Sequence, residues 1–457
     1  MSQDYFGNPT ETHREDTQRA ISDFVADFLA YRPAAERILK AADDDAQSGL
    51  ANALAGILLM FIESPEGPKL AARYQLRAAQ ATERDQRRSS LYLQLLDAWI
   101  LDDLEQVATL SETLLDEFPR DLFALKINQY FHFNRGDWPA MLRVALKGVA
   151  HAADISHTHA MLAFAYEQCH LLEQAENAAR HSLSLQADEP WAQHAVAHVL
   201  LTTGRINEGT AFLQQASAGW EGLNSFMYTH NWWHLALFHL ARGRDQTVLD
   251  IYDRHVWGII PEYSQDQIGA VSLLARLELA GVDVGPRWQA LGKYLLVRVD
   301  DTVQSFLSLQ YLYGLARAGH LAEAEQLLDA LTRHAAQVPE FTRGVWNEIT
   351  LPVAQGLLAH ARNDYASAAR LLGSALPRLN EIGGSHAQRD LFALIELDAR
   401  LRSGDWLAVQ QILELRRRHD PMDVPTNRSL AEVYQQLGLP DEARRAEERV
   451  AEVLARR

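Results

Sequence analysis

Short turns recur along this chain at regular intervals. The turns that start at Asp102, Gly136, His170 and Gly204 follow one another at steps of 34 residues. Later turns follow at steps of 39, 38, 38, 44, 41 and 34 residues, and they start at Gly243, Gly281, Gly319, Asn363, Gly404 and Gly438. A period of this length indicates that one small structural unit is repeated, and each unit must stack on its neighbours to bury its apolar face.

The segments between the turns carry a helical pattern. Apolar side chains after the turn at Gly319 recur with a period of 3.6, at Leu321, Ala324, Leu327, Leu328 and Leu331. Ala163 and Ala197 lie 34 residues apart, at a position where two close-packed helices need a small side chain. We therefore predict an all-α fold, a right-handed α-solenoid of the tetratricopeptide type, in which antiparallel helix pairs form a superhelix.

The repeat register also predicts the organisation of the chain. Residues 1–90 are helical but out of register, and we expect them to cap the array at its N-terminal end. Residues 91–438 form the repeat superhelix, and residues 439–457 read as a charged capping helix. No long linker rich in Pro, Gly or Ser interrupts the array, so we expect one continuous superhelix.

The charge and the cysteine content of the chain limit which classes of partner and which cellular compartment we expect. The 457 residues include 43 Lys and Arg against 60 Asp and Glu, a formal net charge of −17. Nucleic acid and anionic membranes are bound by clustered cations, so neither is an expected partner. The single cysteine, Cys169, permits no intrachain disulfide and fits a reducing compartment. No apolar run is long enough to span a membrane and no secretory signal opens the chain, so we expect a cytoplasmic protein.

Histidine and tryptophan gather in three consecutive repeats. If Gly204 is position 15 of its unit, the first helix begins at Pro190, and positions 2, 5 and 9 face the concave groove. These positions are Trp191, His194 and His198. The unit before contributes Glu167 at position 12. The unit after contributes His230, Trp233 and His234, with Asn231 and Trp232 between them.

This patch has two interpretations. Residues four apart share a helix face, so His194 with His198 and His230 with His234 form two pairs that we expect to converge with Glu167. Such a set can hold a divalent metal through imidazole nitrogens, or it can supply general acid and base groups. The alternative is that the imidazoles satisfy hydrogen bonds between packed helices and the tryptophans are core. A His-Glu-x-x-His zinc motif is excluded, because residues 194–198 lack the glutamate.

Four blocks resemble the tetratricopeptide repeat protein 38 family. They are Trp191–Val199 with Gly204–Gly209, His230–Leu240, Ser272–Trp288 and Gly383–Asp390, within roughly residues 156–400. The resemblance implies an α-solenoid of tetratricopeptide type and leaves the reaction open. The chain departs from the family's Phe-x-Asp-x-His pattern, because Ser308 and Gln310 stand where an Asp and a His are expected. That departure would remove a carboxylate and an imidazole from the neighbouring helix.

The fourth block has a possible ligand role of its own. Ser385 follows two glycines and can cap a helix that starts near His386, where backbone N–H groups favour an anion. Arg389 can add a bidentate contact to a carboxylate, with Gln388 beside it. The alternative is a stiff turn in which Arg389 pairs with Glu396. About ten repeats turn a superhelix through a large angle, so this block can face the histidine patch across the groove.

We predict from these features a pocket rich in His and Trp that binds a small molecule. The chemistry would be hydrolysis or proton transfer, with or without a divalent metal, at a catalytic group comprising Glu167, His194, His198, His230 and His234. The ligand-binding residues would be Trp191, Asn231, Trp233, Asp266, His386, Gln388 and Arg389. Asp266 has a plain structural alternative as a helix cap. The alternative function is a non-catalytic scaffold whose groove binds a peptide or protein.

Overall fold

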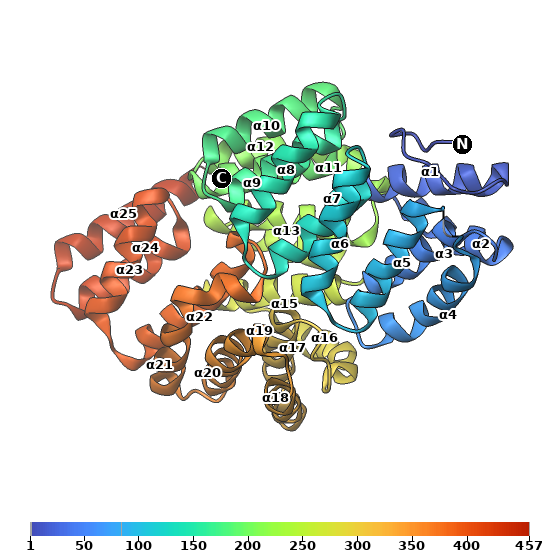
Figure 1. Ribbon diagram of the computed structural model, residues 1–457. Coiled ribbons are helices and arrows are strands. Elements are labelled where there is room, and N and C mark those ends of the chain that lie inside the picture. The colour runs from blue at the N-terminus through green and yellow to red at the C-terminus, as the bar shows by residue number, and fades with distance from the viewer. Residues whose placement is uncertain (1, 84, 457) are drawn as a thin grey trace. The chain divides into compact units, whose positions relative to one another are not determined.

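The computed structural model describes residues 2–83 and 85–456, and most of them are helical (Figure 1). Within these ranges no β-strand forms, and the only β pairing is an isolated bridge between Gln3 and Pro9. Met1 and Arg457, the outer bounds of the two predicted caps, lie outside the described residues. The all-α prediction is confirmed.

The predicted turns are the places where the backbone enters the left-handed region. Each of the ten starts at a residue with positive φ, from 58° at Asp102 and His170 to 92° at Gly319. Most of them are glycines, which have no Cβ to oppose this conformation and commonly end a helix. Gly204 has a second reason to be glycine besides its positive φ. A Cβ added there would lie 2.0 Å from the carbonyl oxygen of His419, which is far too close. The turn chemistry therefore sets the repeat boundaries.

The chain forms two compact units. The first comprises Met1–Val196 and Gly219–Met227, and the second comprises Ala197–Ala218 and Tyr228–Arg457. The boundary runs through α11 (Pro190–Thr202) and α13 (Ser225–Ala241), so no linker separates the units. The cap and repeat bounds given by the sequence stay a prediction.

The first unit is built from helices that pack on their sequence neighbours. They are α1 (Glu15–Leu29), α2 (Arg37–Asp44), α3 (Gly49–Met60), α4 (Glu66–Ala81), α5 (Arg87–Ile100), α6 (Leu104–Glu117), α7 (Leu122–Asn134), α8 (Trp138–Ala152), α9 (Ser156–Gln168) and α10 (Leu172–Leu185), with the start of α11. Alternate helices also touch, as α3 does with α5 and α7 with α9. This is the stacking expected of helix pairs in a solenoid.

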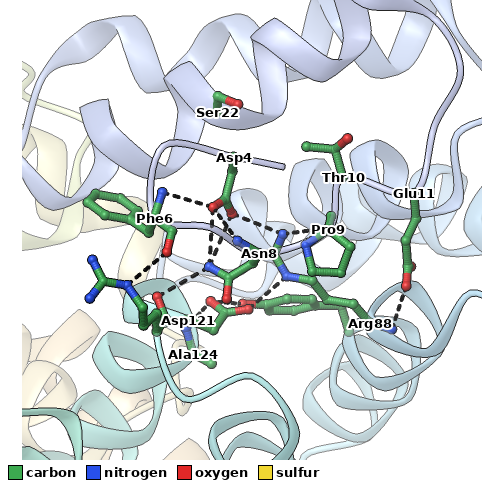
Figure 2. Close-up of polar contacts among 12 residues, drawn as sticks. Asp4, Phe6, Asn8, Pro9, Thr10, Glu11, Ser22, Arg88, Asp121 and Ala124 are labelled. Carbon is green, nitrogen blue, oxygen red and sulfur yellow. Dashed lines mark hydrogen bonds and ion pairs between the residues drawn. The ribbon is translucent and has the colours of Figure 1, made fainter. Parts of the chain in front are cut away.

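A buried ionic network ties the N-terminal segment to the first unit, as Figure 2 shows. The guanidinium of Arg88 on α5 lies 3.0 Å from Asp4 and 2.8 Å from Asp121, and all three side chains are inaccessible to solvent. Arg88 also donates to the carbonyl oxygen of Pro9, and Tyr92 donates to Asp121. Asp121 in turn caps α7. Each charge in this cluster thus has an opposite charge beside it.

The second unit continues the same pattern of helix pairs. Its helices are the end of α11, α12 (Ile206–Ala216), most of α13, α14 (Asp245–Ile251), α15 (Ser264–Leu279), α16 (Arg287–Leu295), α17 (Ser305–Arg317), α18 (Leu321–Ala335), α19 (Glu340–Gly344), α20 (Leu351–Ala361), α21 (Tyr365–Ala375), α22 (His386–Ser403), α23 (Trp406–His419), α24 (Val424–Gln436) and α25 (Pro440–Ala455). The first helices α15, α17, α20 and α22 pack each on the next.

In the second unit, helices that are far apart in the sequence also pack on each other. Helices α15 and α22 pack together although they lie more than a hundred residues apart in the sequence (Figure 1). Arg276 on α15 donates to the carbonyl oxygen of Ala387 on α22 at 2.5 Å. A second contact of this kind is the ion pair between Arg242 and Asp420 at 2.6 Å, in which both side chains are largely buried. These contacts bring repeats that are distant in the sequence next to each other.

Among residues 2–83 and 85–456, no helix combines the length and the apolar composition that crossing a membrane requires.

Candidate functional site

Three of the predicted histidines meet in the second unit. His230 and His234 lie one turn apart on α13, and their ring centroids are 4.8 Å apart. The ring of His198, from the end of α11, lies 4.6 Å from that of His234. We call His198, His230 and His234 the imidazole cluster. One ring nitrogen of each lies within 4.8 Å of those of the other two.

The cluster is held inside the protein. The side chains of His198 and His234 are at most 1% exposed, whereas His230 is half-buried. Trp233 stacks on His230 at an angle of 8° and meets the ring of His234 edge-on at 82°. His194 lies one turn before His198 on α11, and it belongs to the first unit.

Burial makes these imidazoles weak bases. Desolvation, together with the neighbouring imidazole of His198, lowers the pKa of His230 to about 3. The pKa of His234 also lies well below its usual value, chiefly through desolvation and further through its histidine neighbours and Arg276. Both rings are therefore neutral at pH 7, where each can coordinate a metal or accept a hydrogen bond. A base with so low a pKa is poorly matched to proton transfer near neutral pH, which disfavours the predicted acid/base role for these two histidines.

A small pocket lies beside the cluster. It is bordered by α13, α15, α17 and α22, all within the second unit, and its space of about 240 Å³ is partly open to solvent. Its lining consists of His230, Trp233, Gln265, Ile268, Gly269, Ser272, Gln310 and Gln388. His230 belongs to both the imidazole cluster and the pocket, so the two form one candidate site.

Two polar atoms of the pocket residues have no hydrogen-bond partner in the protein. They are the hydroxyl of Ser272, a residue 4% exposed, and the indole N–H of Trp233, a residue 1% exposed. Both amide atoms of the buried Asn231 are likewise without a partner. Buried polar groups are normally paired, so these exceptions point to groups that a ligand would satisfy. Among the described residues that line the pocket, none carries a formal charge at neutral pH.

Arg276 contacts both α13 and α22, two of the helices that border the pocket. Its guanidinium lies 5.6 Å from the ring of Trp233 and donates to the backbone of α22 next to Gln388. Burial lowers the pKa of Arg276 to about 10, which leaves it charged at pH 7. Burial also opposes the charge of Asp390, but Arg416 and Arg276 outweigh it and lower the pKa of that carboxyl.

Sequence reasoning did not select three of the polar pocket residues, Gln265, Ser272 and Gln310, as ligands, and it also missed Arg276. Ser272 and Arg276 fall within the third block of the family resemblance, so that motif was the available signal. At Gln310 the only sequence signal is the departure from the family pattern. Gln265 carries no sequence signal that separates it from a surface glutamine. Only the packing of α15 with α17 and α22 places these side chains at one pocket.

Asp266 is occupied by structural contacts. Its carboxylate accepts hydrogen bonds from the hydroxyl of Thr229 at 3.2 Å and from the backbone N–H of Ile260 at 3.0 Å. These bonds tie the loop before α15 to α13. Asp266 is not the helix cap that the sequence offered as an alternative, because the N-cap of α15 is Tyr263 and Asp266 lies within the first turn. Its predicted role in ligand binding stays a prediction.

The remaining predicted residues of the patch belong to the first unit. Trp191 stacks on His194, with centroids 4.4 Å apart, and on Tyr31 at 5.5 Å. The ammonium of Lys126 lies 3.7 Å from the Trp191 ring, and burial lowers the pKa of Lys126 to about 7. Glu167 is fully buried and accepts a hydrogen bond from the amide of Gln168. The ligand and catalytic roles of these residues stay predictions.

The fourth block forms the capping arrangement that its sequence indicates. Ser385 caps α22, and its side chain and that of Gln388 bond each other's backbone N–H in a capping box. Arg389 donates to the carbonyl oxygen of Gly384 and approaches His386 at 3.2 Å. Glu396, the alternative partner considered for Arg389, forms an ion pair with Arg400. Gln388 alone of this block lines the pocket, and an anion site at His386 and Arg389 stays a prediction.

Comparison with known proteins adds the following. No family model matches the chain. Similar solved structures include the human IFIT1 dimer with PPP-AAAA, at 11% identity over 92% of this chain and 95% of that one, with a TM-score of 0.42. The Naa15/Naa10 complex bound to HypK-THB gives 12% identity, 94% and 67% coverage and a TM-score of 0.25. The Cut9–Hcn1 assembly of the APC/C gives 10% identity, 82% and 95% coverage and a TM-score of 0.29. By its turns and stacked helix pairs, the chain is an all-α solenoid of the tetratricopeptide type.

Proposed function

We propose that the chain is a cytoplasmic member of the tetratricopeptide repeat protein 38 family and binds a small polar molecule in the pocket of its second unit. Three of the blocks that carry the family resemblance supply pocket residues. The second supplies His230 and Trp233, the third Ser272 and the fourth Gln388. Gln310, where the family pattern has His, lines the same pocket. The resemblance and the geometry thus support one site.

One observation carries the proposal. The hydroxyl of Ser272 and the indole N–H of Trp233 are buried, belong to pocket residues and have no hydrogen-bond partner in the protein. Leaving such a group unpaired costs about 1–3 kcal/mol. A bound molecule with oxygen acceptors would offset that cost after a side-chain movement that opens these buried atoms to the pocket.

The lining defines the chemical class of the molecule. The amides of Gln265, Gln310 and Gln388 each offer a donor and an acceptor, and no charged side chain balances a ligand charge at the pocket surface. The parallel rings of His230 and Trp233 form a flat wall. We therefore assign the ligand as a neutral compound with amide or hydroxyl groups. The pocket is small, so we expect a ligand smaller than most drugs.

Hydrolysis remains the enzymatic reaction that we propose, and it needs an activating group besides the histidines. The low pKa of His230 makes that ring a poor general base at neutral pH. The competing proposal is the peptide-binding scaffold. A pocket of this volume would then hold one side chain of the peptide, and the peptide backbone would lie outside it.

The absence of nucleic-acid binding also stays a proposal. The IFIT1 structure contains PPP-AAAA, whereas no side chain in the described lining of the pocket is a cation that could pair with a phosphate. We expect no measurable affinity for a 5′-triphosphate RNA at physiological salt. Filter binding with that RNA tests this point.

A ligand screen with matched variants tests the pocket. A panel of small neutral amides and polyols is scored by the increase in Tm of the full chain, against Trp233→Phe, Ser272→Ala and the control Trp288→Phe. Trp288 is a fair control, because it lies in the same unit and is 3% exposed, and its indole N–H also has no partner. We expect compounds that stabilise the wild type and the control but not the two pocket variants. A panel without any stabilising compound, or equal stabilisation of every variant, contradicts the proposal.

A further inference from the structure

We propose that His198, His230 and His234 bind one divalent transition-metal ion of the zinc type. The site lies at the edge of the pocket, and the role that the ion plays for a ligand there rests on the proposed function. The binding of the ion itself rests on the arrangement of the three imidazoles alone.

The donor atoms are close enough for a single ion. One nitrogen from each ring lies within 4.8 Å of the others. Zinc binds imidazole nitrogen at about 2.0–2.1 Å, which puts tetrahedral ligands about 3.3 Å apart. Small rotations of the rings about their side-chain bonds close the difference, so the backbone can stay in place.

Two helices supply these donors in a favourable geometry. His230 and His234 are four residues apart on α13, where side chains project from one face in consecutive turns. His198 reaches the same point from α11. Trp233 packs against the rings of both His230 and His234 and so restricts their orientation. Restricted rings lose less entropy when they bind an ion.

The donor set selects the class of metal. All three ligands are imidazoles, which suit zinc, copper, nickel and iron, whereas magnesium and calcium prefer oxygen. A helix contact of this kind could be filled by apolar side chains at no cost in desolvation. The three ring nitrogens that meet here are instead a ligand set that suits an ion of this class.

The ion would border the pocket through His230, which belongs to both groups of residues. Three protein ligands leave a coordination position open, as catalytic zinc sites do. When bound, zinc supplies Lewis-acid polarisation of an oxygen atom that enters the pocket. The hydroxyl of Ser272 and the amide of Gln310 would orient that molecule by hydrogen bonds.

Calorimetric titration of the chelator-treated, tag-free full chain with zinc chloride tests the inference. We expect one ion per chain with a Kd of about 1 µM or tighter, that is about −8 kcal/mol or more favourable. His198→Gln and His234→Gln should weaken binding by about tenfold or more, because each removes a ligand. The control His239→Gln, at a buried histidine of the same helix outside the cluster, should bind zinc like the wild type.

Binding that is absent at micromolar zinc, or equally weak in the control and the cluster variants, overturns the inference. Cobalt provides a second readout on the unaltered protein in case a variant does not fold. Paramagnetically shifted ring signals from the three histidines in the NMR spectrum of the cobalt complex support the site. A complex without such signals overturns it.

The two proposals fail separately. Ser272→Ala should abolish ligand stabilisation and leave zinc binding unchanged, because the hydroxyl is not a member of the cluster. A pocket that binds its ligand in a chain without zinc affinity contradicts only the metal site. Zinc binding without any pocket ligand contradicts only the proposed function.

Discussion

Two of the polar clusters described above differ in their composition: one pairs opposite charges, and the other consists of imidazoles. In the first unit, Arg88 lies between Asp4 and Asp121, with every side chain of the trio inaccessible to solvent (Figure 2). In the second unit, the imidazole cluster brings together three side chains of one type. The first cluster pairs opposite charges, whereas the second brings together imidazoles, which we propose as ligands of a metal ion.

The pKa values express the same difference. Burial opposes the charge of Arg88, but Asp121, Tyr92 and Asp4 more than offset this effect, and its pKa is raised. At His230 burial also opposes the charge, and the neighbouring imidazole adds to that effect, so its pKa falls to about 3. The charge of Arg88 is balanced by its neighbours, so we assign this cluster a structural role. His230 is neutral and lies beside a pocket whose residues include the unpaired hydroxyl of Ser272 and indole N–H of Trp233, so we assign this cluster to a candidate site.

The largest expected effect is at the compensated cluster. Arg88→Met leaves the carboxylates of Asp4 and Asp121 buried without a countercharge, so the free energy of unfolding should fall by about 3–5 kcal/mol. Urea unfolding followed by circular dichroism measures this. A loss as small as that of an exposed pair, such as Lys40→Met beside Asp44, would show that the first cluster is not structural.

Zinc should stabilise the second cluster and leave the first unaffected. At a free concentration of 100 times its Kd, zinc raises the free energy of unfolding by about 2.7 kcal/mol, because it binds the folded state. Removal of the ion with a chelator reverses the gain. The gain should disappear in His234→Gln and persist in a variant of the exposed pair, Lys40→Met. Equal gains in both variants would contradict the assignment.

Acid should destabilise the second cluster in the metal-free protein. The unfolded chain protonates His230 below its ordinary pKa of about 6.5, whereas the native state does so only near pH 3. Stability is therefore complete above pH 6.5 and falls between pH 6.5 and pH 3, by up to about 1.4 kcal/mol per pH unit for this group. Unfolding at several pH values measures the slope, which should be smaller in His230→Gln. An unchanged slope in that variant would mean that His230 is not protected from protonation.

The smallest expected effect on stability is at the pocket. Ser272→Ala removes a hydroxyl that has no partner in the protein, so the free energy of unfolding should change by less than about 1 kcal/mol, in either direction. The same variant should lose the ligand stabilisation entirely. A large loss of stability would instead place Ser272 with Arg88, among the groups that hold the fold.

Local chemistry made much of the fold predictable. A residue with positive φ stands at each turn that the spacing indicated, including Asp102, His170 and Asn363, which are not glycines. Helical periodicity likewise placed His230 and His234 on one face of α13. Both results depend only on residues close in the sequence, where backbone sterics and the 3.6-residue period decide.

Tertiary packing decided which residues meet at the pocket. The rotation from one repeat to the next depends on helix contacts and on insertions that stretch the period to 38–44 residues. Only the closure of α22 onto α15 through Arg276 brings Gln388 to Ser272 and Trp233. The depressed pKa of His230 has the same origin, because desolvation depends on what surrounds a ring in space. The sequence alone determined the repeat register and the helix faces, since these follow from local backbone geometry. The pocket and its electrostatics were decided by the tertiary structure, since they arise from contacts between residues on different repeats, some of them more than a hundred positions apart.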